Sequence, residues 1–330
     1  MIRTGIVGLG KMGVSHCAIL NALAETDVVA VCDSSRLALA VLERYTGVSC
    51  FTNHRRMLDK SDLDAVVIAT PPSSHAEIVA DALERGVHVF VEKPFCLDVD
   101  EGRRLIELAE SRELVNQVGY HLRFCGTFRE AKRLLASGAI GEPYHFTAEC
   151  YGCVFAHATG KTWRAKRAEG GGCLYDYASH AVDLVNYLLG PPSSVAGTVM
   201  KSIMSSNSED AVYSTLRHDS GLAGQLAVNW CDPTYRRMTI RITVLGTLGK
   251  LVTDRQECAL YVEGEGWTVR YTTELTPPVD FYLRGEEYTA QLDHFVEAAR
   301  EGRPTSSTFA SAHQSDVVAD LLARDARGGG

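Results

Sequence analysis

The sequence has little of what several classes of protein need. Its 33 lysines and arginines are outnumbered by 41 acidic residues, which leaves a formal net charge of −8. That balance argues against a broad surface for nucleic acid or anionic membranes. No apolar run is long enough to span a bilayer, and the first residues lack the three regions of a signal peptide. Neither an internal repeat nor a low-complexity linker is present. We therefore expect no nucleic-acid partner and no membrane partner.

Cysteine is frequent but follows no pattern. The chain has 10 cysteines in 330 residues, scattered and mostly within apolar runs. Cys150, Cys153 and His157 have the residue types of a zinc site, but the second pair that would complete one is absent. No metal is therefore expected. We expect buried, reduced thiols and a cytoplasmic location.

The order of the predicted elements indicates two domains. Up to about residue 122, short apolar strands alternate with amphipathic helices, which is typical of βαβ units and a buried parallel sheet. Later, helices at 128–137 and 174–189 are followed by strand-like runs separated by turns and then by helices at 286–299 and 309–322. We predict an α/β protein: an N-terminal Rossmann domain with a doubly wound parallel sheet over 1–122, and a C-terminal α+β domain with a large, mostly antiparallel sheet over 123–330.

A glycine-rich turn joins the first strand to the first helix. It consists of Gly8, Leu9, Gly10, Lys11, Met12 and Gly13, the pattern G-x-G-x-x-G. Gly8 permits the tight turn, Gly10 lets the backbone approach a pyrophosphate, and Gly13 lets the helix pack on the strand. The N–H groups and the dipole of the helix then favour the phosphates. The turn predicts a dinucleotide site.

Asp33, at the end of the second strand, bears on the choice of dinucleotide. A carboxylate there accepts hydrogen bonds from the ribose hydroxyls and repels a 2′-phosphate, which favours NAD. Ser34 and Arg36 follow directly, and they could hold a phosphate if Asp33 turned away. NADP therefore stays open as an alternative.

Two further strand ends carry polar side chains: Thr70-Pro71-Pro72 with His75, and Glu92-Lys93-Pro94. Together with the glycine turn, these T-P-P-x-x-H and E-K-P patterns resemble the Gfo/Idh/MocA family of sugar and polyol oxidoreductases. The G-G-G-x-x-x-D-x-x-x-H pattern at 170–180 and the segments 118–124 and 301–304 agree with the same family.

The resemblance implies two domains with catalysis at their junction. Lys93 matches the family's catalytic lysine, and Asp176 and His180 match an acid–histidine pair of its inositol dehydrogenase-like members. The resemblance also suggests a cis Lys93–Pro94 bond. Chemistry is consistent with these roles: His180 can accept the hydroxyl proton, Asp176 can orient the ring or bind a neighbouring hydroxyl, and Lys93 can stabilise negative charge on the reacting oxygen.

Other residues are candidates for contacts with the two ligands. Thr70, Pro71, His75, Glu92 and Lys93 are expected near the cofactor, and Tyr120, His121, Arg123, Trp163 and Arg164 near the substrate. Several alternatives stay open: His75 could only cap its helix, Trp163 could be a surface residue, and Arg123 and Asp183 could each belong to a structural ion pair. Glu92 is expected to orient Lys93 or the ribose rather than to act as the base.

These expectations define a leading hypothesis and two alternatives. The leading one is an NAD(P)-dependent oxidoreductase acting on a secondary alcohol or ketone of a sugar, cyclitol or sugar nucleotide. The alternatives are an NAD-dependent glycosidase that oxidises its substrate transiently, and a non-enzymatic sensor of sugar or cofactor. Because a large sheet face needs a cover, we also expect a homodimer or homotetramer.

Overall fold

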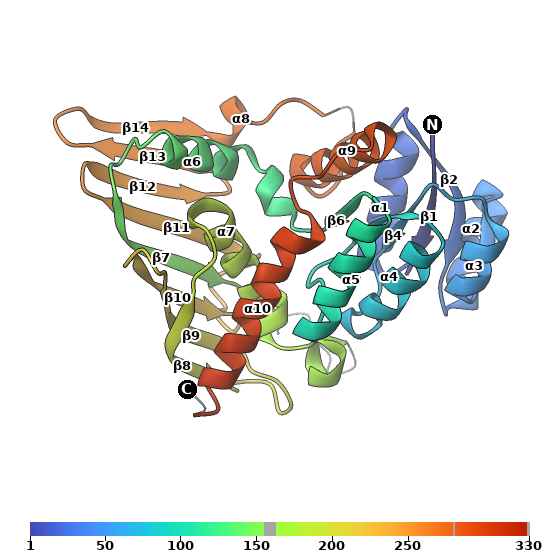
Figure 1. Ribbon diagram of the computed structural model, residues 1–330, viewed down its shortest axis with the longest axis horizontal. Coiled ribbons are helices and arrows are strands. Elements are labelled where there is room, and N and C mark those ends of the chain that lie inside the picture. Colours follow the sequence, from blue (N-terminus) through green and yellow to red (C-terminus); the bar gives the residue numbers. More distant parts are fainter. Residues whose placement is uncertain (155–162, 280, 329–330) are drawn as a thin grey trace. The chain divides into compact units, whose positions relative to one another are not determined.

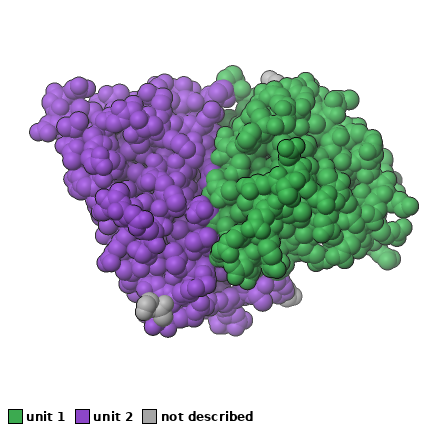
Figure 2. Space-filling view, in the orientation of Figure 1, with its two compact units in different colours: residues 1–121, 278–313 green, residues 122–277, 314–330 purple. Residues whose placement is uncertain are grey.

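The structure, a computed structural model, describes residues 1–154, 163–279 and 281–328. His157, considered above as a metal ligand, lies outside these residues. The chain forms two compact units, one of residues 1–121 and 278–313 and the other of residues 122–277 and 314–330 (Figure 2).

The first unit contains a six-stranded parallel sheet in the order β3-β2-β1-β4-β5-β6 (Figure 1). Its strands are β1 (Ile2–Val7), β2 (Thr26–Cys32), β3 (Ser49–Phe51), β4 (Ala65–Ile68), β5 (His88–Val91) and β6 (Asn116–Val118). Its helices include α1 (Lys11–Ala22), α2 (Arg36–Thr46), α3 (His54–Lys60), α4 (His75–Glu84), α5 (Val99–Ser111) and α9 (Glu286–Glu301). The predicted Rossmann fold is confirmed. The short elements β3 and α3 were not predicted, because they bury too few apolar residues to give a periodic signal.

The predicted division at residue 122 is wrong for the C-terminal part of the chain. Helix α9 belongs to the first unit, where Leu292 and Phe295 join the core formed by Ile6 and Leu20. Helix α10 (Phe309–Asp325) starts in the first unit and ends in the second. An amphipathic pattern indicates that a helix covers a sheet but not which sheet, so the order of elements alone misassigned 278–313.

The second unit contains an eight-stranded sheet in the order β14-β13-β12-β11-β7-β10-β9-β8. Its strands are β7 (Pro143–Tyr151), β8 (Ser194–Lys201), β9 (Ala211–Arg217), β10 (Ala223–Asn229), β11 (Thr239–Gly246), β12 (Gly249–Asp254), β13 (Glu257–Val262) and β14 (Gly266–Tyr271). The mostly antiparallel sheet is confirmed. The unpredicted strand β7 lies in its interior, parallel to β10 and antiparallel to β11.

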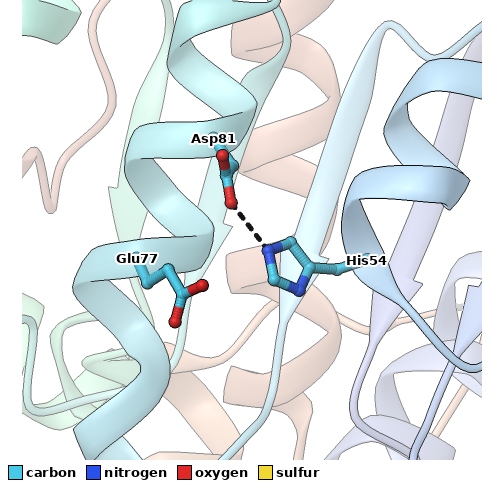
Figure 3. A group of neighbouring side chains, drawn as sticks. All are labelled: His54, Glu77 and Asp81. Atoms are coloured by element: carbon cyan, nitrogen blue, oxygen red, sulfur yellow. Dashed lines mark hydrogen bonds and ion pairs between the residues drawn. The ribbon is translucent and has the colours of Figure 1, made fainter.

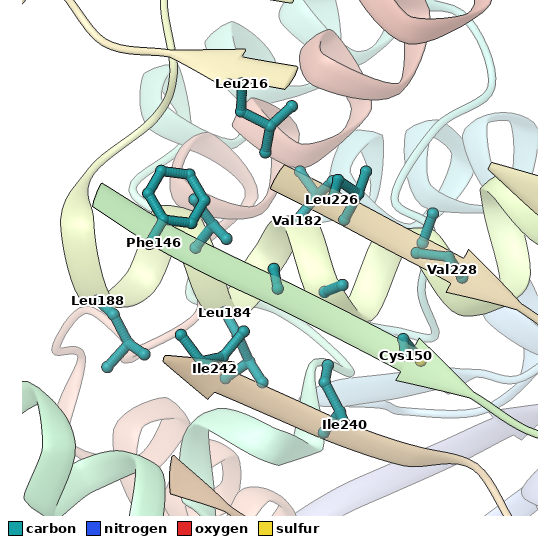
Figure 4. Packing of buried hydrophobic residues seen from close by; sticks show 14 of the residues in the cluster. Phe146, Cys150, Val182, Leu184, Leu188, Leu216, Leu226, Val228, Ile240 and Ile242 are labelled. Carbon is teal, nitrogen blue, oxygen red and sulfur yellow. The ribbon is translucent and has the colours of Figure 1, made fainter. Parts of the chain in front are cut away.

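One face of this sheet packs against helices α6 (Gly126–Ala136) and α7 (Ser179–Leu189). Figure 4 shows part of this core, with Phe146 of β7, Leu226 of β10 and Ile242 of β11 near Val182 and Leu184 of α7. The packing holds α7 and the turn before it against the sheet. In the described part of the chain, no helix is long and apolar enough to cross a membrane.

Candidate active site

The glycine turn gives each of its glycines a different environment. Gly8 has a φ of +95°, and a Cβ there would lie 2.7 Å from the carbonyl oxygen of Ala69. A Cβ on Gly13 would lie 1.7 Å from the carbonyl oxygen of Gly8. A Cβ on Gly10 would meet no protein atom within 4 Å. Gly8 and Gly13 are therefore required by the turn itself, whereas Gly10 borders open space.

The start of α1 fits a phosphate group. Its N-cap is Gly10, and no side chain caps the first turn, where Lys11 is exposed and Met12 half-buried. The first N–H groups of a helix have no intrahelical partner and carry the positive end of its dipole. A pyrophosphate in the open space at Gly10 would satisfy them.

Asp33 is held firmly at the end of β2. Its Oδ2 accepts a hydrogen bond of 2.6 Å from the backbone N–H of Leu9, and its Oδ1 accepts one of 2.7 Å from that of Ser35. The carboxylate cannot turn away without losing both bonds, so the condition for a 2′-phosphate site at Arg36 is not met. Ser34 and Arg36 are exposed. This arrangement favours NAD over NADP.

His75 lies between two backbone carbonyl groups. It is fully buried, with Nδ1 2.9 Å from the carbonyl oxygen of Pro94 and Nε2 3.0 Å from that of Thr70. Burial lowers the pKa of His75, which favours the neutral ring. The neutral ring lies between the segments that follow β4 and β5 and donates to only one of the two carbonyl oxygens, and its predicted contact with the cofactor stays a prediction. The Oγ1 of Thr70 accepts a bond from Ser74, while Pro71 is exposed.

The Glu92-Lys93-Pro94 segment follows β5, and its Lys93–Pro94 bond is cis as the resemblance suggested. Lys93 is half-buried. One oxygen of Glu92 lies 3.3 Å from the backbone nitrogen of Lys93, consistent with an orienting role, and the other lies 2.6 Å from Nε2 of His16. His16 was not among the residues predicted to be functional.

Tyr120 and His121, expected to bind substrate, lie in the packed interior. Tyr120 is fully buried in the core cluster that includes Phe95. The ring of His121 stacks on Tyr288 with centroids 4.3 Å apart. These contacts pack both residues among protein groups, and their predicted contact with the substrate stays a prediction.

In the second unit, three glycines lead into the helix that carries Asp176 and His180. A Cβ on Gly171 would lie 2.4 Å from the carbonyl oxygen of Arg164. Gly172 has a φ of +113°, and a Cβ there would lie 2.1 Å from Oε1 of Glu209. That oxygen accepts a hydrogen bond of 3.0 Å from the backbone N–H of Leu174. The glycines thus let Glu209 cap the start of the helix.

Asp176 lies in a π-helical turn, η5 (Leu174–Ala178), that continues into α7 with His180. Both side chains are largely buried. Arg164, in the turn η3 (Trp163–Ala165), donates a hydrogen bond of 2.7 Å from Nε to the Asp176 carboxylate, whose charge raises the pKa of the guanidinium. The same guanidinium lies 4.7 Å from the Trp163 ring centre. Arg164, predicted to contact substrate, is a partner of the candidate catalytic carboxylate.

Arg123 belongs to a buried ion pair with Asp183, the structural alternative left open by the sequence. Its Nε and Nη2 donate to the carboxylate at distances of 2.6 to 3.1 Å, and both side chains are at most 4% exposed. The pair compensates the buried charge of Arg123 within the protein, and its predicted contact with the substrate stays a prediction.

Among the described residues, one group combines metal-ligating side chains: His54, Glu77 and Asp81. Figure 3 shows His54 on α3 facing Asp81 on α4. Arg55 donates to Asp81 at 2.8 Å and to Glu77 at 2.7 Å. Because Arg55 bridges both carboxylates and Arg85 also pairs with Asp81 at 3.5 Å, the group is an ion-pair network that links two helices. Cys150, from the sequence pattern considered above, is buried in the core.

Two family models match the chain. The model described as "Oxidoreductase family, NAD-binding Rossmann fold" matches residues 2–120, and the "GFO/IDH/MocA C-terminal domain" matches residues 128–252. A curated relative, scyllo-inositol 2-dehydrogenase (NAD(+)) of Bacillus subtilis, is 28% identical over 92% of this chain and 87% of that protein. Another, the rhizopine catabolism protein MocA of Rhizobium meliloti, is 27% identical over 98% of this chain and 96% of that protein.

A solved structure agrees with these matches. Levoglucosan dehydrogenase in complex with NADH and levoglucosan aligns over 100% of this chain and 98% of that one, with a TM-score of 0.88 at 22% identity. At this level of identity the agreement shows a shared fold.

Proposed function

Because the chain belongs to the Gfo/Idh/MocA family of oxidoreductases and has its NAD-binding Rossmann domain, we propose that it is an NAD-dependent dehydrogenase of sugars, cyclitols or sugar nucleotides. NAD, when bound at the glycine turn, would supply the acceptor for the hydride that leaves the carbinol carbon. The hydroxyl proton leaves for a base of the protein, and the product is a ketone. The same groups serve the reverse reduction.

The observation that carries this proposal is the glycine turn together with Asp33. The turn leaves open space at Gly10 beside an uncapped helix start, and two backbone N–H groups hold the Asp33 carboxylate. This combination supports a site for the pyrophosphate and ribose of NAD. A sensor would need the same site, but it would not need Lys93 and His180, and this chain retains both.

We assign the chemistry to Lys93, Asp176 and His180. His180 accepts the hydroxyl proton, and Asp176 orients its ring or binds a neighbouring hydroxyl. Arg164 supports Asp176 by holding its carboxylate. Lys93 supplies the positive charge that stabilises oxygen as the proton leaves.

The names of the relatives support the substrate class. One is called a scyllo-inositol dehydrogenase and another takes part in rhizopine catabolism, while the structural neighbour was solved with the anhydrosugar levoglucosan. Cyclitols and sugars share rings that carry several secondary hydroxyl groups. A panel of inositols, sugars and sugar nucleotides is therefore the first choice of substrates.

Turnover of that panel, followed as the change in NADH absorbance, tests the function. We expect Lys93→Ala and His180→Ala to lower kcat by about a hundredfold or more, since each removes a group that acts on the reacting proton or charge. Lys166→Ala, which changes an exposed lysine paired with Glu169, is the matched control and should leave kcat unchanged. The proposal fails if no compound changes the absorbance, or if Lys93→Ala is as active as the wild type. Solvent deuterium in a hydrolysed product without net NADH would instead indicate the glycosidase.

We further propose that a second copy of the chain covers the outer face of the eight-stranded sheet. Tyr213, Tyr261, Trp267 and Tyr271 on this face are each at least 36% exposed, and Val199 lies opposite Tyr213. Tyr261, Trp267 and Tyr271 lie together on β13 and β14, whereas Tyr213 lies on β9 with four strands between, and exposed aromatic side chains are enriched at protein interfaces. Trp267→Arg should lower the mass measured by light scattering. A wild type that is monomeric at micromolar concentration would contradict the proposal.

We also propose a cytoplasmic location. The ten cysteines, all within the described residues, are thiols, and burial raises the pKa of several of them, including Cys17 and Cys173. Such thiols persist in a reducing compartment. Fractionation of cells that express the protein tests this, and recovery from an oxidising compartment would contradict it.

A further inference from the structure

A buried hydrogen bond lies next to the Lys93 segment. His16, on the second turn of α1, is fully buried, and its Nε2 lies 2.6 Å from Oε1 of Glu92. The Glu92 side chain is 13% exposed. This distance is short even for a hydrogen bond that involves an ionised carboxylate. The mechanism proposed above uses neither side chain directly.

The carboxylate of Glu92 is confined by its neighbours. One oxygen pairs with His16, and the other lies 3.3 Å from the backbone nitrogen of Lys93. Gly119 lies against the same carboxylate, because a Cβ there would be 3.1 Å from Oε2. A carboxylate largely removed from water needs such partners, so its position depends on them.

His16 is itself held in place. Its ring packs edge to face on Phe90 of β5, with centroids 5.4 Å apart, and Phe90 packs in the same way on Phe295 of α9. Its Nδ1 is buried and has no hydrogen-bond partner in the described part of the chain. The polar contact of the ring is therefore made through Nε2 alone, toward Glu92. A phenylalanine would satisfy the packing as well, so the histidine is explained by the hydrogen bond.

We propose that His16 is a positioning residue of the active site: its Nε2 fixes the Glu92 carboxylate, and the fixed carboxylate holds the backbone of Lys93. This inference rests on the proposed function, because it gives Lys93 its catalytic role. His16 acts through Glu92 and touches neither cofactor nor substrate. This positioning role explains why the pair of His16 and Glu92 lies beside the segment that carries Lys93.

The test compares His16→Phe with His16→Gln. His16→Phe keeps a ring against Phe90 but removes the donor, so kcat should fall by about tenfold to a hundredfold while the Kd for NAD changes by less than about twofold. His16→Gln restores a donor and should recover most of kcat. His54→Phe is the matched control, since it removes a comparable bond to Asp81 in the same unit and should leave kcat unchanged.

Hydrogen exchange at the Lys93 amide provides a readout that needs no turnover. Exchange should be faster in His16→Phe than in the wild type and unchanged in His54→Phe. Gly119→Ala gives an independent perturbation, because its methyl group would press on the Glu92 carboxylate from another side. Gly119→Ala should change hydrogen exchange at the Lys93 amide and lower kcat, as His16→Phe does. If His16→Phe does not fold, Gly119→Ala tests the proposal in its place.

Wild-type exchange and wild-type kcat in folded His16→Phe would overturn the proposal. If only Gly119→Ala can be prepared, wild-type exchange at Lys93 together with wild-type kcat in that folded variant would overturn the proposal. The proposed function fails in a different way, namely when the wild type turns over no substrate. Exchange at Lys93 would then still show whether His16 positions this segment.

Discussion

Both units place glycines before a helix, but they use the start of the helix differently. In the first unit, Gly10 borders open space and no side chain caps α1. In the second, the Glu209 carboxylate fills the space beside Gly172 and accepts the N–H of Leu174. A helix N-terminus attracts negative charge in either case. At the start of α1 a bound ligand would provide the negative charge, whereas at the helix after Gly172 the Glu209 carboxylate provides it.

The comparison shows why a glycine-rich pattern alone does not identify a phosphate site. A run of glycines before a helix can lie next to a bound anion or next to a side-chain carboxylate of the protein itself. Which one applies depends on whether a protein group occupies the space next to the backbone.

The largest effect is expected for Gly13→Ala. Its Cβ would lie 1.7 Å from the backbone oxygen of Gly8, which cannot move without opening the turn, so we expect a loss of about 3 kcal/mol in the free energy of unfolding. Gly10→Ala is the control, because its Cβ meets no protein atom. It should keep wild-type stability in chemical denaturation but bind NAD about tenfold more weakly, or about 1.4 kcal/mol. Unchanged NAD binding by Gly10→Ala would place the pyrophosphate elsewhere.

Asp33→Ala should change the choice of cofactor. It removes the acceptor for two backbone N–H groups and the charge that repels a 2′-phosphate. We expect the ratio of NAD to NADP affinities, measured by titration, to fall by about tenfold or more. Asp33→Asn keeps an acceptor but loses the charge, so it should be the more stable variant with a similar loss of preference. A wild-type ratio in both variants would refute this role of Asp33.

Glu209→Ala should destabilise the glycine segment 170–172 and the helix that follows it, without affecting the glycine turn of residues 8–13. It leaves the N–H of Leu174 without its acceptor, which should cost about 1 to 2 kcal/mol of stability. Glu209→Gln keeps an acceptor oxygen and should cost less than about 0.5 kcal/mol. NAD affinity should stay at the wild-type value in both. A loss of NAD affinity in Glu209→Gln would mean that the two turns are not independent.

The smallest effect is a pH dependence of the second turn. Burial raises the pKa of Glu209 above its usual value, so the folded chain holds this proton more tightly than the unfolded chain does. The resulting stability is present below the unfolded pKa and is lost as the pH rises through the folded pKa. Glu209→Gln lacks this loss, so its free energy of unfolding relative to that of the wild type should increase in denaturation experiments as the pH rises above about 4.3, the ordinary pKa of a glutamate. A constant difference over this range would contradict the shift.

Elements with a strong local pattern were predictable. The strands and helices of the parallel sheet follow from apolar runs and amphipathic spacing, and Gly8, Gly13 and Asp33 follow from the geometry of one turn. Strand β7 was missed, although it lies in the interior of the second sheet. Its buried Phe146, Ala148 and Cys150 alternate with Thr147 and Glu149, which is typical of a half-buried strand, but this pattern was not used in the prediction.

The partners of the candidate catalytic residues were not predictable. The acceptor at Leu174 comes from a residue 35 positions away, and the donor to Glu92 from one 76 positions away. Nothing in the local sequence of Glu209 or His16 indicates these contacts. Arg123 and Arg164 were recognised as important, but a charge pattern could not separate an ion pair from a ligand contact.

Short-range order along the chain thus specified the strand–turn–helix units and the candidate NAD site, and the resemblance to the family pointed to the residues able to move a proton. Folding added the contacts between distant segments: α9 on the first sheet, Glu209 at the second turn and His16 against Glu92. The physical reason is that local patterns depend on backbone geometry over a few residues. Which side chain fills a given space depends on packing, which brings together residues that the sequence keeps apart.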